Sequence, residues 1–450
     1  MRVLFIHQNC PGQFKHLAPY LASDARNEVV FITRPGKPDL PNVRKIEYKQ
    51  KRPVARSTHR YLRLMEEGVL NGQAVASAAI RLRDGGFVPD VIVAHMGWGE
   101  ALYVKMVWPQ APLLGYFEWY YHAFGSDVDF DPRKLPDIDD ICRVETRNGM
   151  HLLNLQTADR GLSPTRWQWQ QHPAEYRAKI SVIHDGVDVD KVRPNPQVTG
   201  SLREGLRLRA GDEVVTYVAR NLEPYRGFPT FMQAAKLILE RRPNTQILVV
   251  GGDDVSYGSK RTDGKSYREH YLETLKLDTS RIHFLGRVPY DRYLQILQLS
   301  AAHIYLTFPF VLSWSMMEAM AAGCLVIGSR TAPVEEVIKD GRNGLLVDFF
   351  SATEVADRVD DVLDHPDRMQ RLRDAARQTV IQRYALQSCL QKQVQLIEQM
   401  AGSRKSARTG TATRRRTKAA VRVATQGRGR RRAPARCGRC SSPPRRPAAR

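Results

Sequence analysis

The segment at residues 307–350 places a loop, a helix and a strand within one short α/β unit. Pro309 interrupts the structure before it and disfavours helical geometry at the preceding residue. Residues 313–322 then predict a helix rich in small residues, and Gly323 is positioned to end it. The apolar run at 324–327 is typical of a buried parallel strand. A chain with such a unit is predicted to fold as an α/β protein.

The start of this predicted helix is suited to an anion. The helix follows the carboxyl end of a strand, and its first turn has unpaired N–H groups at the positive end of the dipole. Phosphates bind at such positions in open α/β sheets. Glu318 projects from the same helix and could accept hydrogen bonds from a sugar hydroxyl. Alternatively, Ser315 and Glu318 fit a capping box, in which the carboxylate satisfies only the N–H groups of the helix.

Short apolar strand patterns alternate with helical patterns along most of the chain. The expected strands are residues 3–7, 28–33, 43–48, 91–95, 113–117, 153–157, 180–184, 213–219, 246–250, 282–285 and 302–306. The expected helices include residues 16–22, 58–71, 73–83, 229–241, 267–275, 290–299 and 353–363, followed by a long helical pattern from 366 to about 400. This alternation predicts parallel sheets with helices on both faces.

The 450 residues suit two or three domains by length. We expect a first Rossmann-like domain at 1–192, a linker at 193–212 and a second Rossmann-like domain at 213–365. Helices at 366–401 are expected to pack back toward the first domain. The remaining segment, 402–450, is predicted to be a disordered Arg-rich tail, because it has almost no large apolar residues with which to bury a core.

The tail also explains the net charge of +22. Residues 402–450 hold 17 Lys or Arg and no Asp or Glu, which leaves 52 basic and 47 acidic residues elsewhere, a net charge of about +5. Such a tail could bind nucleic-acid phosphates without sequence preference, could be attracted to an anionic membrane surface, or could have no function of its own. Its Cys437 and Cys440 form one CxxC without a second ligand pair, which is a weak zinc signal.

Other features of the composition indicate a cytoplasmic protein. No apolar run approaches the roughly 18 residues of a membrane helix. The apolar run in the opening MRVLFIHQN is too short for a signal peptide, and it predicts a first strand. The six cysteines are scattered and do not suggest a disulfide framework.

The sequence EAMAAGCLVIGS at residues 318–329, with the later runs PVEEV and DGRNGLLV, resembles the donor-site signature of retaining GT4 glycosyltransferases, which have the GT-B fold. In that family two glutamates lie eight positions apart; the second binds the donor's ribose hydroxyls and the first faces the donor sugar. Glu318 matches the second glutamate. Phe310 stands at the first position, and Ser313 replaces a usual glycine.

Two further segments are similar to the same family. Residues 185–188 resemble the Asn-Gly-Val-Asp turn that closes the first half, with Asp185 in place of the asparagine. Residues 1–22, with HQNCPGQFKHLA, look like the opening of a GT4 subgroup. The resemblance covers about residues 1–400 and implies two Rossmann-like domains facing a cleft, the first for the acceptor and the second for the nucleotide-sugar donor.

Arg220 and Arg226 are candidates for binding the donor diphosphate. They lie six positions apart in one strand-to-helix loop and could supply two cations to a leaving group. From the residues alone, a solvated pair of loop charges is the favoured explanation, and Glu223 could pair with either arginine. The resemblance favours phosphate contacts, with Arg226 in place of a usual lysine, and implies that Gly12 and Gln13 lie near the phosphates.

Glu118 and His122 are the catalytic candidates in the first domain. Members of the family often have a histidine after the strand predicted here at 113–117, and this chain has Glu118 there. Glu118 could position the acceptor hydroxyl or support positive charge at the anomeric carbon. His122 is the competing candidate, and His95, at the end of another strand, is the third. Glu118 or His122 could also be an ordinary polar residue at the edge of the cleft.

We expect no metal site and no cofactor beyond the donor itself. Asp127, Asp129 and Asp131 form DxD-like pieces that could hold Mg²⁺ in a GT-A enzyme. The order of the predicted elements argues against that fold. The two arginines and the helix amides can provide the charge stabilisation that a divalent metal provides elsewhere.

The sequence thus predicts a retaining, metal-independent glycosyltransferase that moves a sugar from a nucleotide diphosphate sugar to a hydroxyl acceptor. The family context suggests a saccharide or lipid-linked glycan acceptor in polysaccharide biosynthesis, handled in the cytoplasm or at the inner face of the membrane. The alternatives are another GT-B enzyme, such as a nucleotide-sugar epimerase, and a nucleic-acid-binding protein that acts through its tail without a specific nucleic-acid partner.

Overall fold

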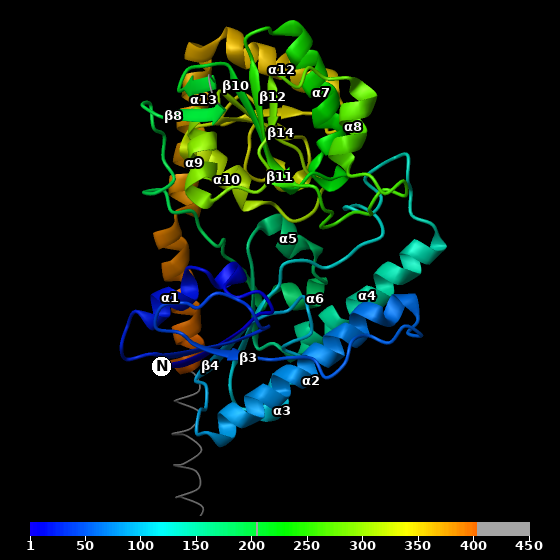
Figure 1. Ribbon diagram of the computed structural model, residues 1–450. Helices are drawn as coiled ribbons and strands as arrows, with labels where there is room; N and C mark the ends of the chain where they lie inside the picture. The colour runs from blue at the N-terminus through cyan, green and yellow to red at the C-terminus, as the bar shows by residue number, and fades with distance from the viewer. Residues whose placement is uncertain (204–205, 403–450) are drawn as a thin grey trace, which may run out of the picture. The chain divides into compact units, whose positions relative to one another are not determined.

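A computed structural model describes residues 1–203 and 206–402. Within them the chain forms two parallel sheets with helices on both faces of each (Figure 1). Both sheets lie in one compact unit, Met1–Ala401. The predicted disordered tail, including Cys437 and Cys440, lies outside the described residues. The prediction of two Rossmann-like domains is confirmed by these sheets.

The first sheet has seven strands in the order β3-β2-β1-β4-β5-β6-β7, all parallel. Its strands are β1 (Arg2–Ile6), β2 (Glu28–Thr33), β3 (Arg44–Glu47), β4 (Val91–His95), β5 (Leu113–Tyr116), β6 (Arg160–Ser163) and β7 (Ile180–Val182). Its helices are α1 (Leu17–Ala22), α2 (Arg63–Asp84), α3 (Val104–Val107), α4 (Ile138–Thr157), α5 (Arg166–Gln171) and α6 (Ala174–Arg177).

The second sheet has six parallel strands in the order β12-β11-β10-β13-β14-β15. Its strands are β10 (Val214–Asn221), β11 (Gln246–Gly252), β12 (Ile282–Phe284), β13 (Ala302–Tyr305), β14 (Leu325–Ser329) and β15 (Leu345–Val347). Its helices are α7 (Phe228–Arg241), α8 (Tyr267–Leu275), α9 (Tyr290–Leu299), α10 (Trp314–Ala322), α11 (Ala332–Glu335), α12 (Ala352–Asp364) and α13 (Pro366–Tyr384).

The helix predicted at 313–322 forms as α10, and its caps agree with the sequence. Ser313 is the N-cap and accepts a hydrogen bond from the N–H of Ser315 at 3.3 Å. Gly323 ends the helix in the left-handed region, with φ of 88°, where a residue with a Cβ is disfavoured. Strand β14 follows directly, as the apolar run predicted.

Two predictions for the first domain are wrong, one for a strand and one for a pair of helices. Residues 153–157 are the last turn of α4 and not a strand, and β6 begins three residues later. Leu153 is 45% exposed while Leu155 is buried, which is a one-sided helical pattern within a short apolar run. The two helices expected at 58–71 and 73–83 form the single helix α2. Gly72 does not end it; a Cβ there would lie 2.9 Å from the carbonyl oxygen of Gly99, so the glycine permits a close packing contact.

The segment predicted as a linker contains secondary structure. Within 193–212, strands β8 (Thr199–Arg203) and β9 (Leu206–Arg209) pair antiparallel. Helix α9 fixes this pair, because Gln295 donates to the carbonyl of Thr199 at 2.6 Å and Arg292 donates to that of Ser201 at 2.7 Å. The hairpin thus packs beside the second sheet.

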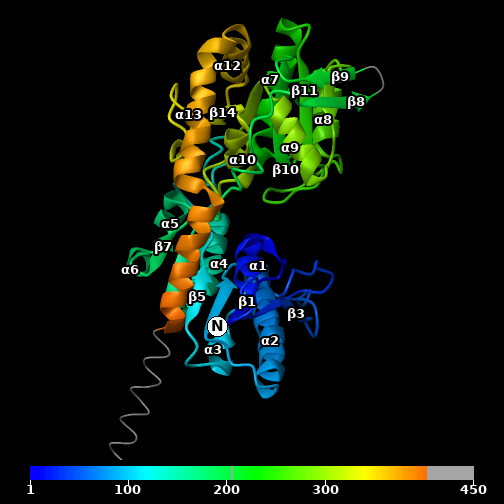
Figure 2. The same cartoon turned by 90° about the vertical axis from the view of Figure 1, so that its left-hand side faces the viewer.

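Helix α13 and the helix at 386–402 carry the chain from one sheet to the other (Figure 2). At the extended Ala385 the chain pairs with Val187, whose N–H donates to Tyr384 and whose carbonyl accepts from Leu386, both at 2.8 Å. Residues of α13 pack with α10, whereas Leu390 and Ile397 pack with apolar residues of β1.

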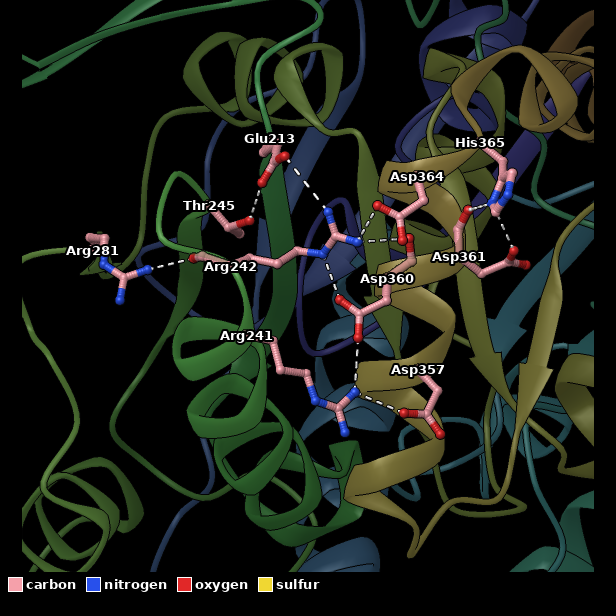
Figure 3. Close-up of polar contacts among 10 residues, drawn as sticks. All are labelled: Glu213, Arg241, Arg242, Thr245, Arg281, Asp357, Asp360, Asp361, Asp364 and His365. Atoms are coloured by element: carbon pink, nitrogen blue, oxygen red, sulfur yellow. Dashed lines mark hydrogen bonds and ion pairs between the residues drawn. The ribbon is translucent and has the colours of Figure 1, made fainter.

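Ion pairs hold α12 against α7 (Figure 3). Arg241 donates to Asp357 at 2.8 Å and to Asp360 at 2.9 Å. Arg242 donates to Asp360 at 2.5 Å and to Asp364 at 2.6 Å, and its side chain is only 14% exposed. This network supports the outer helix layer of the second domain.

Candidate functional site

Polar side chains gather where three neighbouring strands of the first sheet end. His7 follows β1, His95 ends β4, and Glu118 comes two residues after β5. The register pairs Ile6 with Ala94 and His95 with Tyr116, which brings the three strand ends to the same edge. The carboxyl edge of a parallel sheet is where α/β proteins bind ligands.

The backbone fixes the tautomers of both histidines. The N–H of Asn9 donates to Nδ1 of His7 at 2.9 Å, and the N–H of Gly97 donates to Nδ1 of His95 at 3.1 Å. Since a backbone N–H can only donate, each Nδ1 is an acceptor and the proton of each neutral ring lies on Nε2. Both Nε2–H groups are therefore available to the interior of the site.

The Nε2–H of His7 is directed toward Gln13, and that of His95 toward Glu118. His7 Nε2 lies 2.7 Å from Gln13 Oε1, and Gln13 Nε2 donates to Glu118 Oε1 at 3.0 Å. His95 Nε2 lies 3.4 Å from Glu118 Oε2, which is ion-pair distance and longer than a good hydrogen bond. Glu118 thus accepts a hydrogen bond at Oε1, and the ring of His95 lies beside Oε2. We call His7, Gln13, His95 and Glu118 the glutamate array.

The charges of the array follow from its surroundings. Burial, together with the nearby His95, lowers the pKa of His7 to about 3, so the ring is neutral near pH 7. Burial works to raise the pKa of Glu118, but the donors His95 and Gln13 and the charge of Arg226 outweigh it and hold the pKa below its usual value. Glu118 is therefore an oriented carboxylate near pH 7, with its side chain 30% exposed.

Gly12 lies against the ring of His7. It has φ of 50°, and a Cβ there would lie 2.7 Å from His7 Nε2. A larger residue would displace the ring that orients Gln13. Gly97 is similarly close to His95, since its Cβ would lie 2.8 Å from Cε1 of that ring.

Arg226 approaches the array from the second domain. It lies in a one-turn helix before α7, is 7% exposed, and donates from Nη1 to Thr307 Oγ1 at 2.7 Å and to the carbonyl of Val311 at 3.2 Å. Its charge is close enough to lower the pKa of Glu118. Arg220 is the second-last residue of strand β10, is exposed, and forms no ion pair within the described part of the chain.

Glu223 pairs with neither arginine. It is fully buried, and its carboxylate accepts the backbone N–H groups of Ser256, Tyr257 and Gly258 at 2.9–3.1 Å. It therefore orders the loop after β11 beside the two arginines. The sequence offered only its position between them, and the partners lie more than 30 residues away.

Glu318 does not form a capping box. Its carboxylate accepts from the hydroxyls of Tyr290 and Tyr293 of α9, at 2.7 and 2.8 Å. The capping alternative for Ser315 and Glu318 is therefore wrong, because Ser313 caps the helix. Two phenol donors hold the glutamate at the surface of α10, where a further hydroxyl can reach it.

Phe310 lies in an aromatic cluster where the resemblance would place an acidic residue. Its ring centroid is 4.8 Å from that of Trp119, 5.3 Å from Tyr257 and 5.9 Å from Tyr225. Trp119 follows Glu118 in the first domain, so the cluster joins the two halves beside the glutamate array. Phe310 itself is 7% exposed.

His122 is directed away from the array. Its Nε2 lies 2.8 Å from the carbonyl oxygen of Gln171, near the end of α5. The structure thus brings Glu118, His95 and Gln13 together, and places His122 with α5. His7 is the member of the array that sequence reasoning missed; its position at a strand end, two residues before a turn, was the available signal.

Each DxD-like carboxylate has a partner within the protein. Asp127 accepts from Tyr225 Oη at 3.0 Å, Asp129 accepts from the N–H of Gly125 at 2.8 Å, and Asp131 pairs with Arg133 at 2.7 Å. Within residues 1–203 and 206–402, no group of three or more His, Cys, Asp or Glu residues is arranged to hold a metal ion.

Asp185 joins the two halves at the other side of the array. It accepts from both Tyr116 Oη, at 3.0 Å, and Trp314 Nε1, at 2.9 Å. Burial and the nearby charge of Glu118 raise the pKa of Asp185 to about 7, although the two donors oppose the shift. The N–H groups of Arg166 and Trp167, which begin α5, donate to Glu336 at 2.9 and 2.7 Å across the same boundary.

Solved structures identify the architecture as the GT-B fold of glycosyltransferases. Sucrose-phosphate synthase from Thermosynechococcus elongatus superposes with a TM-score of 0.68 at 18% identity, covering 90% of this chain and 100% of the other. Anabaena HepE, solved in complex with UDP and glucose, has a TM-score of 0.64 at 16% identity and covers 89% of this chain and 100% of its own. At these identities the likeness shows the fold.

Sequence comparisons then identify the family. The model "Glycosyl transferase family 4 group" matches residues 25–192, and "Glycosyl transferases group 1" matches residues 199–379. The chain belongs to the GT4 glycosyltransferases, which confirms the resemblance of the donor-site segment.

Among curated relatives, D-inositol 3-phosphate glycosyltransferase of Corynebacterium glutamicum is 30% identical over 203 residues, 44% of this chain and 46% of the relative. A GDP-mannose-dependent phosphatidylinositol monomannoside mannosyltransferase of Mycolicibacterium smegmatis is 26% identical over 204 residues, 42% of this chain and 49% of the relative. The matched regions therefore span about half the length of these relatives.

No helix in the described ranges is both long and apolar enough to cross a bilayer.

Proposed function

We propose that the protein transfers a sugar from a nucleotide diphosphate sugar to a hydroxyl acceptor, with retention of configuration. The observation that carries this proposal is the glutamate array facing Arg226. An oriented carboxylate from one domain and a buried guanidinium from the other lie at the carboxyl edges of two parallel sheets. That pairing suits a reaction in which positive charge develops on a sugar while negative charge develops on a leaving diphosphate.

The second domain would bind the donor. Arg220 and Arg226 would contact the diphosphate, and the N–H groups at the start of α10, next to Ser313, would add uncharged donors. Glu318 would accept from the ribose hydroxyls, with Tyr290 and Tyr293 holding its carboxylate in place. In this assignment 213–365 is the donor domain and 1–192 the acceptor domain, joined through 193–212 and 366–401.

Glu118 would act at the reacting carbon. As the bond from the anomeric carbon to the diphosphate breaks, its electron pair stays on the diphosphate oxygen, and Arg226 stabilises that charge. The carboxylate of Glu118 stabilises the positive charge that develops on the sugar. The acceptor oxygen then bonds to the anomeric carbon, and the proton of its hydroxyl passes to the departing diphosphate oxygen. Gln13 would position Glu118 rather than the donor phosphates, because its amide nitrogen is committed to that carboxylate.

The acceptor would be a saccharide or a lipid-linked glycan. The named relatives, an inositol phosphate glycosyltransferase and a phosphatidylinositol mannoside mannosyltransferase, support a hydroxylated acceptor of this kind. We further propose that the reaction needs no metal and no cofactor besides the donor, because the two arginines and helix amides can stabilise the leaving group. Polysaccharide biosynthesis in the cytoplasm, in contact with a membrane, is the setting that fits such an acceptor.

Calorimetric titration with UDP-, GDP- and ADP-sugars tests the donor, and transfer of a labelled sugar to an added acceptor tests the reaction. An epimerase would instead interconvert donor sugars without an acceptor.

Arg220→Ala is expected to weaken nucleoside diphosphate binding at least tenfold and nucleoside binding little, since it removes only a phosphate contact. Arg371→Ala, at an exposed arginine of α13, is the control. Equal losses for diphosphate and nucleoside would refute the role of Arg220.

A further inference from the structure

A pocket of about 430 Å³ lies at the amino edge of the second sheet, opposite the edge that carries Arg226. Its lining includes residues 210–213, which lead into β10, residues 298–301, which lead into β13, and Gly323, which precedes β14. Residues 194–196 and the first half of α13 complete it. We call it the linker pocket. Its volume is within the range of pockets that bind small molecules, roughly 300–1,000 Å³.

Two guanidinium groups of α13 line this pocket. Arg373 donates from Nη2 to the carbonyl of Ala301 at 2.8 Å, which is its one hydrogen bond within the described residues. Arg377 donates to backbone carbonyls, among them those of Val192 at 3.0 Å and Val189 at 3.1 Å. Neither arginine forms an ion pair within residues 1–203 and 206–402, and burial lowers the pKa of both groups. Both cations are therefore available to an anion.

The carboxylates of the lining do not cancel both cations. Asp212 pairs with Arg209 at 3.5 Å, and Glu213 pairs with Arg242 at 3.7 Å, so two carboxylates are engaged by arginines outside the lining. Asp374, the third, is exposed and forms no ion pair in the described part of the chain. Two cations therefore stand against one unpaired carboxylate, and the lining has one positive charge in excess.

The start of α13 adds uncharged donors. Pro366, its first residue, lines the linker pocket, and the N-cap residue His365 makes no side-chain hydrogen bond to the helix. The first N–H groups of a helix have no partner within it and lie at the positive end of its dipole. The arginines and this helix start thus provide charged and uncharged donors, a combination that binds phosphate.

Three amide side chains of the lining have atoms left for a hydroxylated group. Gln298 donates from Nε2 to a backbone carbonyl at 2.8 Å, and Gln370 donates from Nε2 to Asp374 at 2.9 Å. Asn195 accepts a backbone N–H at Oδ1, at 3.1 Å. Within the described ranges, the second polar atom of each amide has no hydrogen-bond partner. Hydroxyl groups can donate to the two glutamines and accept from the asparagine.

We propose that the linker pocket binds the phosphate ester of a small sugar, as a ligand distinct from the substrates. The phosphate would lie between the guanidinium groups of Arg373 and Arg377 and the start of α13. The sugar hydroxyls would face the three amides, and proline and leucine side chains of the lining would contact its C–H groups. A phosphate monoester has three terminal oxygens for these donors, whereas a carboxylate has two.

The linker pocket also lies where the chain passes between the two sheets. The carbonyls of Val189 and Val192, which Arg377 holds, belong to the segment that leaves the first sheet. Residues 194–196 continue that segment, and α13 begins the return toward the first sheet. A ligand in the pocket would contact both connections, and its effect on sugar transfer would be regulatory. This last step rests on the proposed function, whereas binding does not.

Modification of arginine by phenylglyoxal in the full-length protein, followed by mass spectrometry of its peptides, locates the ligand. We expect saturating glucose 6-phosphate to slow the modification of Arg373 at least about fivefold, because the occupied guanidinium is covered. Arg371, exposed on the same helix, should react at an unchanged rate. Glucose should give no protection, and inorganic phosphate should protect less than glucose 6-phosphate at the same concentration. Equal protection by inorganic phosphate would overturn the recognition of a sugar.

Calorimetric titration of variants with glucose 6-phosphate measures the affinity. Gln370→Glu, at an exposed position, should weaken binding at least about tenfold, because the new carboxylate repels the phosphate and competes for the guanidinium groups. The matched control, Gln378→Glu, makes the same charge change at an exposed position of α13 outside the lining and should leave the affinity unchanged. Arg373→Gln should also weaken binding at least about tenfold, and thermal unfolding checks that this variant folds.

Unchanged affinity in the Gln370→Glu variant would overturn the proposal. So would protection of Arg220 with no protection of Arg373, because the phosphate would then occupy the proposed donor site. Modification is read for each arginine separately, so arginines of residues 402–450 do not enter the result. Neither measurement depends on sugar transfer, so failure here leaves the proposed function standing, and failure of sugar transfer leaves binding in the linker pocket standing.

Discussion

Asp185→Asn is expected to make the protein more stable at pH 8 and to leave its stability nearly unchanged at pH 4. The pKa of Asp185 is about 7 in the folded protein, against an ordinary value of 3.8. Between about pH 4 and pH 7, the folded protein therefore keeps a proton on this carboxyl that the unfolded chain has already released. The asparagine side chain keeps an acceptor for Trp314 and an N–H donor for Tyr116, and it cannot ionise.

The size of the effect follows from linkage. Because the pKa is raised on folding, the contribution of this group to the free energy of unfolding is fully present below about pH 4. It declines as pH rises through about 7. With 1.36 kcal/mol for each pKa unit, the loss at pH 8 is on the order of 4 kcal/mol. The raised pKa results mainly from burial of the carboxylate, since Asp185 is only 6% exposed.

Urea unfolding at pH 4, 6 and 8 measures this difference. The advantage of the Asp185→Asn variant should grow with pH and level off above pH 7. Asp190→Asn, at an exposed carboxylate five residues away, is the control and should show no such trend. If the pH dependences of wild type and the Asp185→Asn variant ran parallel from pH 4 to 8, the carboxyl would not be protonated in the folded state and the reasoning would fail.

Three other substitutions test the site and its support. Gly12→Ala should lower stability by about 1–3 kcal/mol and reduce transfer, because the φ of 50° is strained for alanine and the added Cβ would lie 2.7 Å from His7 Nε2. Thermal unfolding measures the stability, and the transfer assay measures the activity. Glu318→Ala should weaken the binding of nucleoside and of nucleoside diphosphate by the same factor, about tenfold, because both ligands contain the ribose. Calorimetry measures both affinities, and a loss for the diphosphate alone would contradict the ribose contact. Arg242→Ala should lower the free energy of unfolding by about 1–3 kcal/mol, because Asp360 loses an ion-pair partner whose side chain is largely buried. If urea unfolding showed no loss, the ion-pair network of Figure 3 would not contribute to stability.

The sequence was sufficient to predict the two parallel sheets and most of their strands. Local signals decide such elements: apolar runs for strands, and caps such as Ser313 and Gly323 for helix ends. They failed at 153–157, where a short apolar run belongs equally well to a buried strand or to one face of a helix, and only packing distinguishes the two.

In the candidate site, too, the sequence predicted some features and missed others. The sequence placed Glu118 after a strand, Arg226 in a strand-to-helix loop and Glu318 on a helix, and the family resemblance gave them roles to propose. It did not show that Glu318 is held by Tyr290 and Tyr293, or that Glu223 binds the amides after β11. Those partners lie 25 to 35 residues away along the chain, and residue type and spacing carry no record of such contacts.

What the sequence determined by itself is the set of elements and the family, because both depend on residues close together in the chain. What only the tertiary structure decided is which polar groups meet. His7, Gln13, His95 and Glu118 come from three strand ends and one turn, and become one array only when the sheet sets their register. The direction of each proton in that array depends on backbone N–H groups placed by turns, which is a property of the fold.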